Sequence, residues 1–153
     1  MRLLLALFCF AAAPALAQVQ VLKAWTRATP PGASVAAGYL LLKNNAALAD
    51  RLISVRSPAA ARVETHVTVR DGSISRMREV KGYDVPAGAS LELKPGGAHL
   101  MFVDVKAPFK QGDKIAATLR FQRAGEVKVE FQVEGMGAMG TQHSGQMPDM
   151  KMR

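Results

Sequence analysis

The segment VKVEFQV (Val127–Val133) alternates apolar and polar side chains without a break. Successive side chains of a β-strand point to opposite faces, so this period of two predicts a strand with one buried face. The segment VETHVTV (Val63–Val69) shows the same alternation. No stretch of the chain carries a long helical period, and the sequence therefore predicts an all-β fold.

Short runs rich in Val, Leu, Ile and Phe recur along the chain, separated by the turn residues Gly, Pro, Asp and Asn. Around nine short strands at this spacing predict an antiparallel sandwich or barrel. We expect Trp25, Phe102, Phe121 and Phe131 to fill its core. The predicted strands are Val19–Trp25, Tyr39–Lys43, Leu52–Val55, Val63–Val69, Ser73–Arg78, Ser90–Leu93, His99–Val105, Lys114–Phe121 and Glu126–Val133.

The first 17 residues have the features of an export signal. An arginine follows the initiator methionine, Leu3–Ala13 is an unbroken apolar run, and Ala15–Ala17 has the small-x-small pattern of a cleavage site. We therefore predict cleavage after Ala17, and the apolar run is too short for a membrane span. A lipoprotein site at Cys9 is disfavoured, because Phe8 precedes it where a small residue is expected.

Loss of the signal would remove the only cysteine of the chain. A mature chain without cysteine has no disulfide framework, thiolate zinc site, thiol nucleophile, c-type haem attachment or type-1 copper site. Removing 17 of 153 residues leaves 136, which suits one domain, and we expect a monomer.

The net charge of +8 becomes +7 without the signal's arginine. The positive charges are scattered, which favours a solvated basic surface over attraction to acidic partners or anionic membranes. Without a basic stripe interleaved with aromatic residues, we expect no binding of nucleic acid.

Histidine and methionine are rare in the predicted domain, residues 18–134. Its only histidines are His66 and His99, and its only methionines are Met77 and Met101. Taken singly, each is more typical of a structural histidine or of a methionine that fills a core. Their joint placement favours a metal site.

The predicted strand geometry pairs these four residues. An Asp-Gly pair at 71–72 predicts a two-residue hairpin turn, which would place His66 directly opposite Met77 on one face. His99 and Met101 lie two residues apart on another strand and so also share a face. If the two faces meet, the four side chains form a site with two nitrogen and two sulfur ligands.

This ligand set selects the metal. Neutral thioether sulfur favours Cu(I), whereas zinc takes Cys, His or carboxylate and calcium takes oxygen. In an oxidising compartment a cysteine ligand would be lost to disulfide formation, whereas the thioether of methionine forms no disulfide. Four ligands saturate the metal and leave no position for a substrate, so we expect a carrier and not an enzyme. Carboxylates such as Glu64 and Asp104 are spread over different strands and turns, and we interpret them as solvated surface charges.

The order and spacing of the four ligands match a family motif. The run His66-(10 residues)-Met77-(21 residues)-His99-x-Met101 resembles the H(M)x10Mx21HxM motif of the periplasmic copper A chaperone family, PCu(A)C. Val67 stands where many members of that family carry an additional methionine, and that position is optional.

The resemblance extends over residues 19–134, including the segments at 24–44 and 95–101. It implies a periplasmic protein with a cupredoxin-like Greek-key fold that binds Cu(I). It also implies delivery towards the copper A subunit of cytochrome c oxidase, with Sco-type copper proteins as partners. A copper-sequestering or resistance protein with the same site is the alternative.

The chain changes character at 135–153. This segment is rich in glycine and polar residues and has no β-branched or aromatic side chain except Thr141, which predicts a flexible tail. Its composition favours a secondary metal site for a second copper, as Cu(I) or Cu(II), over a tail with no role. The candidate ligands are Met136, Met139, His143, Met147, Met150 and Met152.

Overall fold

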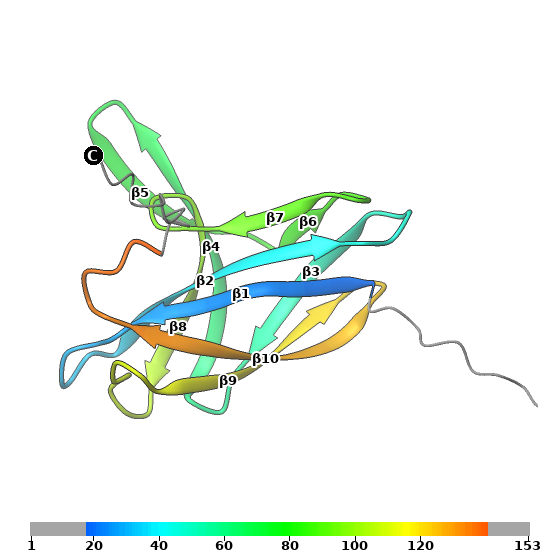
Figure 1. The fold of residues 1–153 in the computed structure, drawn as a ribbon. Helices are drawn as coiled ribbons and strands as arrows, with labels where there is room; N and C mark the ends of the chain where they lie inside the picture. The colour runs from blue at the N-terminus through cyan, green and yellow to red at the C-terminus, as the bar shows by residue number, and fades with distance from the viewer. Residues whose placement is uncertain (1–17, 141–153) are drawn as a thin grey trace, which may run out of the picture.

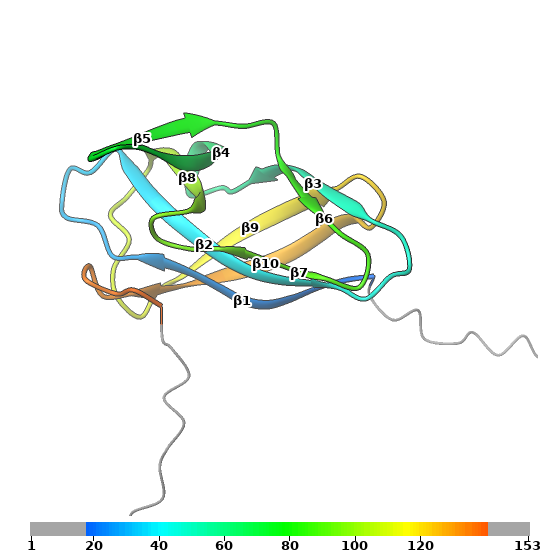
Figure 2. The same ribbon diagram turned by 90° about the horizontal axis from the view of Figure 1, so that it is seen from above.

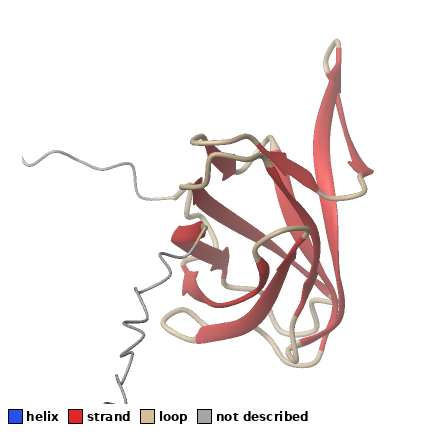
Figure 3. Ribbon diagram, turned by 90° about the vertical axis from the view of Figure 1, so that its right-hand side faces the viewer, coloured by secondary structure: helices blue, strands red, loops and turns tan. Residues whose placement is uncertain are grey.

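A computed structural model describes residues 18–140 of the chain, and over that range it contains strands and loops but no helix (Figure 3). Nothing in this range could therefore cross a membrane as a helix. The predicted signal, residues 1–17, lies outside the described range. The strands are β1 (Val19–Arg27), β2 (Val35–Asn44), β3 (Asp50–Arg56), β4 (Ala60–Asp71), β5 (Ile74–Glu79), β6 (Tyr83–Val85), β7 (Ser90–Leu93), β8 (Ala98–Val105), β9 (Lys114–Phe121) and β10 (Gly125–Glu134).

The all-β prediction is confirmed, and each of the nine predicted strands is present. The additional strand is β6, which has three residues and pairs only with β3. Seven strands form a closed ring in the order β4-β8-β2-β1-β10-β9-β3, because β3 pairs back onto β4 at Val55 and Val63. The strands β5, β6 and β7 flank this barrel (Figures 1 and 2).

One pairing departs from the predicted antiparallel arrangement, since β1 and β10 run parallel. The reason is the number of strands in the ring. A closed ring of seven strands cannot alternate direction throughout, so one neighbouring pair must run the same way. Here this pair joins the first and last strands, with Trp25 opposite Gln132.

The barrel interior holds the aromatic core. Phe102 and Phe131 are fully buried, Phe121 is nearly so, and the rings of Phe102 and Phe131 meet edge-on with centroids 5.4 Å apart. Trp25 is also buried, at 5% exposure, but it lies outside this cluster and packs on Tyr39 with ring centroids 4.4 Å apart. All four predicted aromatic residues are therefore buried, three of them in the main core.

The β4–β5 hairpin extends away from the barrel (Figures 1 and 3). Its turn residues are Gly72 and Ser73, with Gly72 in the left-handed region at a φ of 58°, and Asp71 pairs with Ile74. The predicted turn at 71–72 is therefore wrong by one residue. Moving the turn by one residue moves the partner of every β4 residue by two positions along β5, so that His66 pairs with Glu79.

Candidate metal centre

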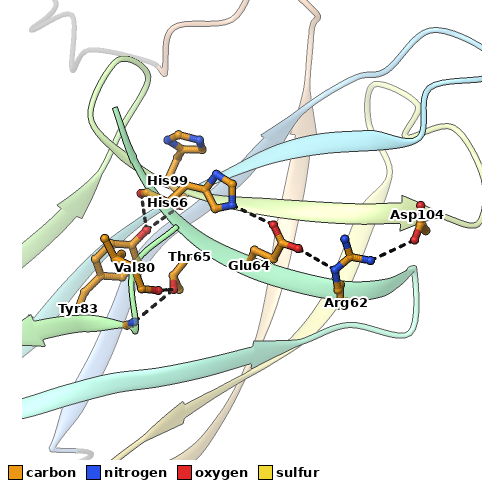
Figure 4. A network of polar contacts seen from close by, with 9 residues as sticks. Arg62, Glu64, Thr65, His66, Val80, Tyr83, His99 and Asp104 are labelled. Carbon is orange, nitrogen blue, oxygen red and sulfur yellow. Dashed lines mark hydrogen bonds and ion pairs between the residues drawn. The ribbon is translucent and has the colours of Figure 1, made fainter. Parts of the chain in front are cut away.

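The structure places His66 of β4 directly opposite His99 of β8. Their imidazole centroids are 5.7 Å apart, and Figure 4 shows both rings on the same side of the strand pair. His99 is buried, at 4% exposure, while the side chain of His66 is 15% exposed. Two segments that are far apart along the chain thus bring two imidazoles together at the edge of solvent.

The two methionines flank this histidine pair on the same face. Met101 lies two residues from His99 on β8, opposite Glu64 of β4, and is half-buried. Directly opposed residues and residues two apart share a face, so Met101 faces the same way as both histidines. Its position agrees with the predicted strand parity.

Met77 does not lie opposite His66 as predicted, because the turn is displaced. His66 pairs with Glu79, and Met77 pairs with Thr68. A shift of two positions preserves the face, so Met77 remains a diagonal neighbour of His66. Diagonal Cβ atoms lie about 7–8 Å apart or slightly less, which long side chains can span. Met77 is 63% exposed on the projecting hairpin.

Each imidazole uses one nitrogen for a hydrogen bond and leaves the other without a partner. His66 Nε2 lies 2.9 Å from Glu64 Oε2, and His99 Nδ1 lies 3.0 Å from the Gly97 carbonyl oxygen. His66 Nδ1 and His99 Nε2 are buried and have no hydrogen-bond partner among residues 18–140. Because buried polar atoms are normally paired, two such nitrogens on neighbouring rings indicate a place for a bound ligand.

Glu64 is part of the site and not a solvated surface charge as predicted. Its side chain is 21% exposed and lies between His66 and Arg62, whose Nε donates to Glu64 Oε1 at 2.7 Å. The hydrogen bond from Arg62, followed by that from His66, holds the pKa of Glu64 below its ordinary value of 4.5. Asp104 in turn accepts from Arg62 Nη1 at 3.2 Å.

Tyr83 supports the histidine pair from the other side of the sheet (Figure 4). Its hydroxyl lies 2.7 Å from the carbonyl oxygens of both His66 and His99, and these two acceptors share its single O–H donor. Burial raises the pKa of Tyr83 to about 12, so the phenol remains a donor at neutral pH. The preceding residue, Gly82, turns the chain towards the histidine strands. It adopts a φ of 79°, and its N–H donates to the hydroxyl of Thr65.

The turn before β8 determines the orientation of His99. Gly96 adopts a φ of 77°, and Gly97 N–H donates to the Lys94 carbonyl at 3.1 Å, which forms a tight turn. The turn directs the Gly97 carbonyl to His99 Nδ1. This glycine turn therefore helps to orient the His99 ring.

The side chains around the histidine pair limit the choice of further ligands. In the part of the chain that the structure describes, no three His, Cys, Asp or Glu side chains are grouped closely enough to hold a metal ion. The side chains that share a face with the histidine pair and could add to it are the thioethers of Met101 and Met77, and thioether sulfur favours a soft ion.

The described part of the predicted tail, residues 135–140, packs on the outside of β1. Arg27 Nε donates to the Ala138 carbonyl at 2.7 Å, and Gly140 lies against the Trp25 ring. Met136 and Met139 are exposed, and Met139 Sδ lies 3.2 Å from Arg27 Nη2. The other candidate tail ligands, His143, Met147, Met150 and Met152, lie outside the described residues.

This barrel belongs to a known class of domains. It matches the copper-bound PCuAC domain of PmoF2 with a TM-score of 0.69 and 29% identity, over 79% of this chain and 96% of that domain. It also matches Cu(I)-bound DR1885 of Deinococcus radiodurans with a TM-score of 0.60 and 27% identity, over 73% of this chain and 75% of that one. The fold is thus the cupredoxin-like barrel of PCuAC domains.

The sequence identifies the family. Residues 19–133 match the family described as "Putative lipoprotein LpqE-like". A relative in Leifsonia xyli subsp. xyli, named "Putative lipoprotein Lxx21020", is 35% identical over 128 residues, which cover 83% of this chain and 76% of the relative. The chain is a member of the LpqE-like family.

Proposed function

We propose that this protein is a periplasmic copper chaperone, which binds Cu(I) through His66, Met77, His99 and Met101 without catalysing a reaction. The observation that carries the proposal is the pair of buried, unpartnered nitrogens, His66 Nδ1 and His99 Nε2, on neighbouring strands. Two thioethers share their face, and two neutral imidazoles with two thioethers form a donor set suited to Cu(I). The copper-bound PCuAC domains of similar fold support the same cargo.

The proposed recipient of the copper rests on the resemblance to the PCu(A)C family. We infer that copper passes towards the copper A centre of cytochrome c oxidase, with Sco-type proteins as partners. The predicted signal at 1–17 supports export, and so do the lipoprotein names of the family and of its relative in Leifsonia xyli. Storage or resistance would use the same ligands, and only transfer separates the two functions.

The site is tested by X-ray absorption of the Cu(I)-loaded mature chain. We expect one tightly bound Cu(I) with two nitrogen and two sulfur neighbours. A variant with leucine in place of every tail methionine is the matched control, and it should keep this spectrum. Tight binding that survives His66→Ala combined with His99→Ala would refute the site, because a copper held elsewhere needs neither ring.

Delivery is tested by mixing the copper-loaded mature chain with an apo copper A domain, with and without a reduced Sco-type protein. Copper that moves to the copper A domain supports the chaperone. Copper that stays on this protein under both conditions supports sequestration instead. The absorbance of the copper A centre, with an oxidant supplied, reports its formation directly.

A further inference from the structure

A series of hydrogen bonds ends at His66, and the donor and acceptor of each bond can be assigned. Asp104 accepts from Arg62, Arg62 donates to Glu64 at 2.7 Å, and Glu64 contacts His66 Nε2 at 2.9 Å (Figure 4). The ionised carboxylate of Glu64, which accepts a hydrogen bond from the Arg62 guanidinium, can only accept from His66 as well. The proton of a neutral His66 ring therefore resides on Nε2, and its lone pair resides on Nδ1.

The same logic gives the opposite result for His99. A backbone carbonyl only accepts hydrogen bonds, so the Gly97 carbonyl, 3.0 Å away, fixes the proton on His99 Nδ1. Its lone pair is then on Nε2. The two nitrogens left with lone pairs are the two that are buried without a partner in residues 18–140.

We propose that Glu64 is a positioning residue, which commits His66 to bind copper through Nδ1 while His99 binds through Nε2. Metal-bound histidines commonly donate their other N–H to a carboxylate or a backbone carbonyl. Here the partner of His66 is a carboxylate and the partner of His99 is a backbone carbonyl. This inference rests on the proposed Cu(I) site, but the proton placement itself is a property of the metal-free protein.

The backbone conformation at Asp104, the first residue of this series of polar contacts, supports a role for the series in positioning His66. Among the described residues, Asp104 is the one non-glycine residue with a positive φ, at 53°. That conformation is uncommon outside glycine, although Asp tolerates it better than most residues. It occurs at the residue whose carboxylate holds Arg62 beside Glu64.

The test begins with nitrogen-15 NMR of the metal-free mature chain at about pH 8, above the ordinary imidazole pKa of about 6.5. We expect the proton on Nε2 of His66 and on Nδ1 of His99. Glu64→Ala should convert His66 to a mixture of tautomers and leave His99 unchanged. Glu64→Gln keeps an oxygen that can accept from Nε2–H, and should restore the wild-type tautomer.

Cu(I) affinity provides the second measurement. Loss of an outer-shell partner of a metal ligand typically costs 10–100-fold, so we expect about that loss for Glu64→Ala and a smaller one for Glu64→Gln. Glu130→Ala is the matched control, because Glu130 forms an ion pair with Lys114 on the exposed β9–β10 surface. It should change neither the tautomers nor the affinity.

The results that overturn the inference are distinct from those that overturn the function. A proton on Nδ1 of His66 in the wild type would contradict it. So would Glu64→Ala with unchanged Cu(I) affinity. If the tautomers are as expected but the protein binds no Cu(I), the proposed function fails and the placement of the protons stands.

Discussion

Replacement of Met77 by leucine separates a metal ligand from a packing residue. Met77 is 63% exposed on a hairpin strand that pairs only with β4, opposite Thr68. Leucine has a similar volume, and exposed substitutions usually change the free energy of unfolding by less than about 0.5 kcal/mol. A thioether that binds copper is the one function that leucine cannot replace.

The expected effects follow from this exposure. Met77→Leu should leave the free energy of unfolding of the metal-free protein unchanged within about 0.5 kcal/mol. Its Cu(I) affinity should fall at least about tenfold, which corresponds to about 1.4 kcal/mol. Met101→Leu, in a half-buried position, should cost less than about 1.5 kcal/mol of stability and weaken Cu(I) binding similarly.

The assay is competition with a colorimetric Cu(I) chelator under anaerobic, reducing conditions, with urea unfolding measured in parallel. Ile74→Leu is the control, because Ile74 lies on the same hairpin strand, is also exposed, at 53%, and has no atom that binds a metal. Wild-type Cu(I) affinity in Met77→Leu would show that the exposed thioether is not a ligand, and a three-ligand site would remain.

Three further predictions concern buried positions and turns of the barrel. Burial raises the pKa of Asp50, but N–H groups of Arg123, Ala124 and Arg51 lower it by more, to below 3.8. Asp50→Ala should therefore cost about 2–4 kcal/mol of unfolding free energy near pH 7, and the difference from wild type should shrink as the pH falls below about 4 in urea titrations. Gly82→Ala should destabilise by more than about 3 kcal/mol, because its Cβ would lie 2.1 Å from the Leu52 carbonyl oxygen; Gly88→Ala, at φ 64° with no atom within 4 Å, should cost only about 1 kcal/mol in the same unfolding assay. In a Tyr39→Phe background, Tyr83 should remain largely un-ionised at pH 10 while the protein is folded, since burial raises its pKa to about 12, and phenolate absorbance that rises around the ordinary value of 10.0 would contradict its buried contact with the histidine strands.

Much of the fold could be predicted because most strands are long enough to show their period. β10 alternates over its whole length and buries one face, whereas β4 alternates in sequence but leaves Val69 exposed, at 43%, where the hairpin extends from the barrel. β6 has three residues, Tyr83–Val85, and a period of two cannot be recognised over that length. The parallel pairing of β1 with β10 depends on the number of strands in the ring, and no local pattern encodes it.

The site was predictable only in part, for a related reason. Strand parity placed His99 and Met101 on one face, but the pairing of His66 with His99 joins strands that are distant in sequence. The hairpin register depended on whether Asp71 belongs to the turn or to the strand, and local turn preference gave the wrong answer. Glu64 has the same parity as His66, but this signal alone does not distinguish a ligand's partner from a surface charge.

The exposure of the four proposed ligands bears on whether the protein carries copper or stores it. His99 is 4% exposed and is held by the Gly97 carbonyl, while Met77 is 63% exposed on the hairpin that extends from the barrel. An incoming ligand from a recipient protein can reach the metal only from the open side, so exchange would begin with displacement of Met77 and end with release by His99. A storage site gains by enclosing every ligand, because enclosure slows such exchange. A site that leaves one neutral thioether open to solvent would favour transfer, and for this reason we propose copper delivery in preference to sequestration, with the transfer experiment as the measurement that decides between them.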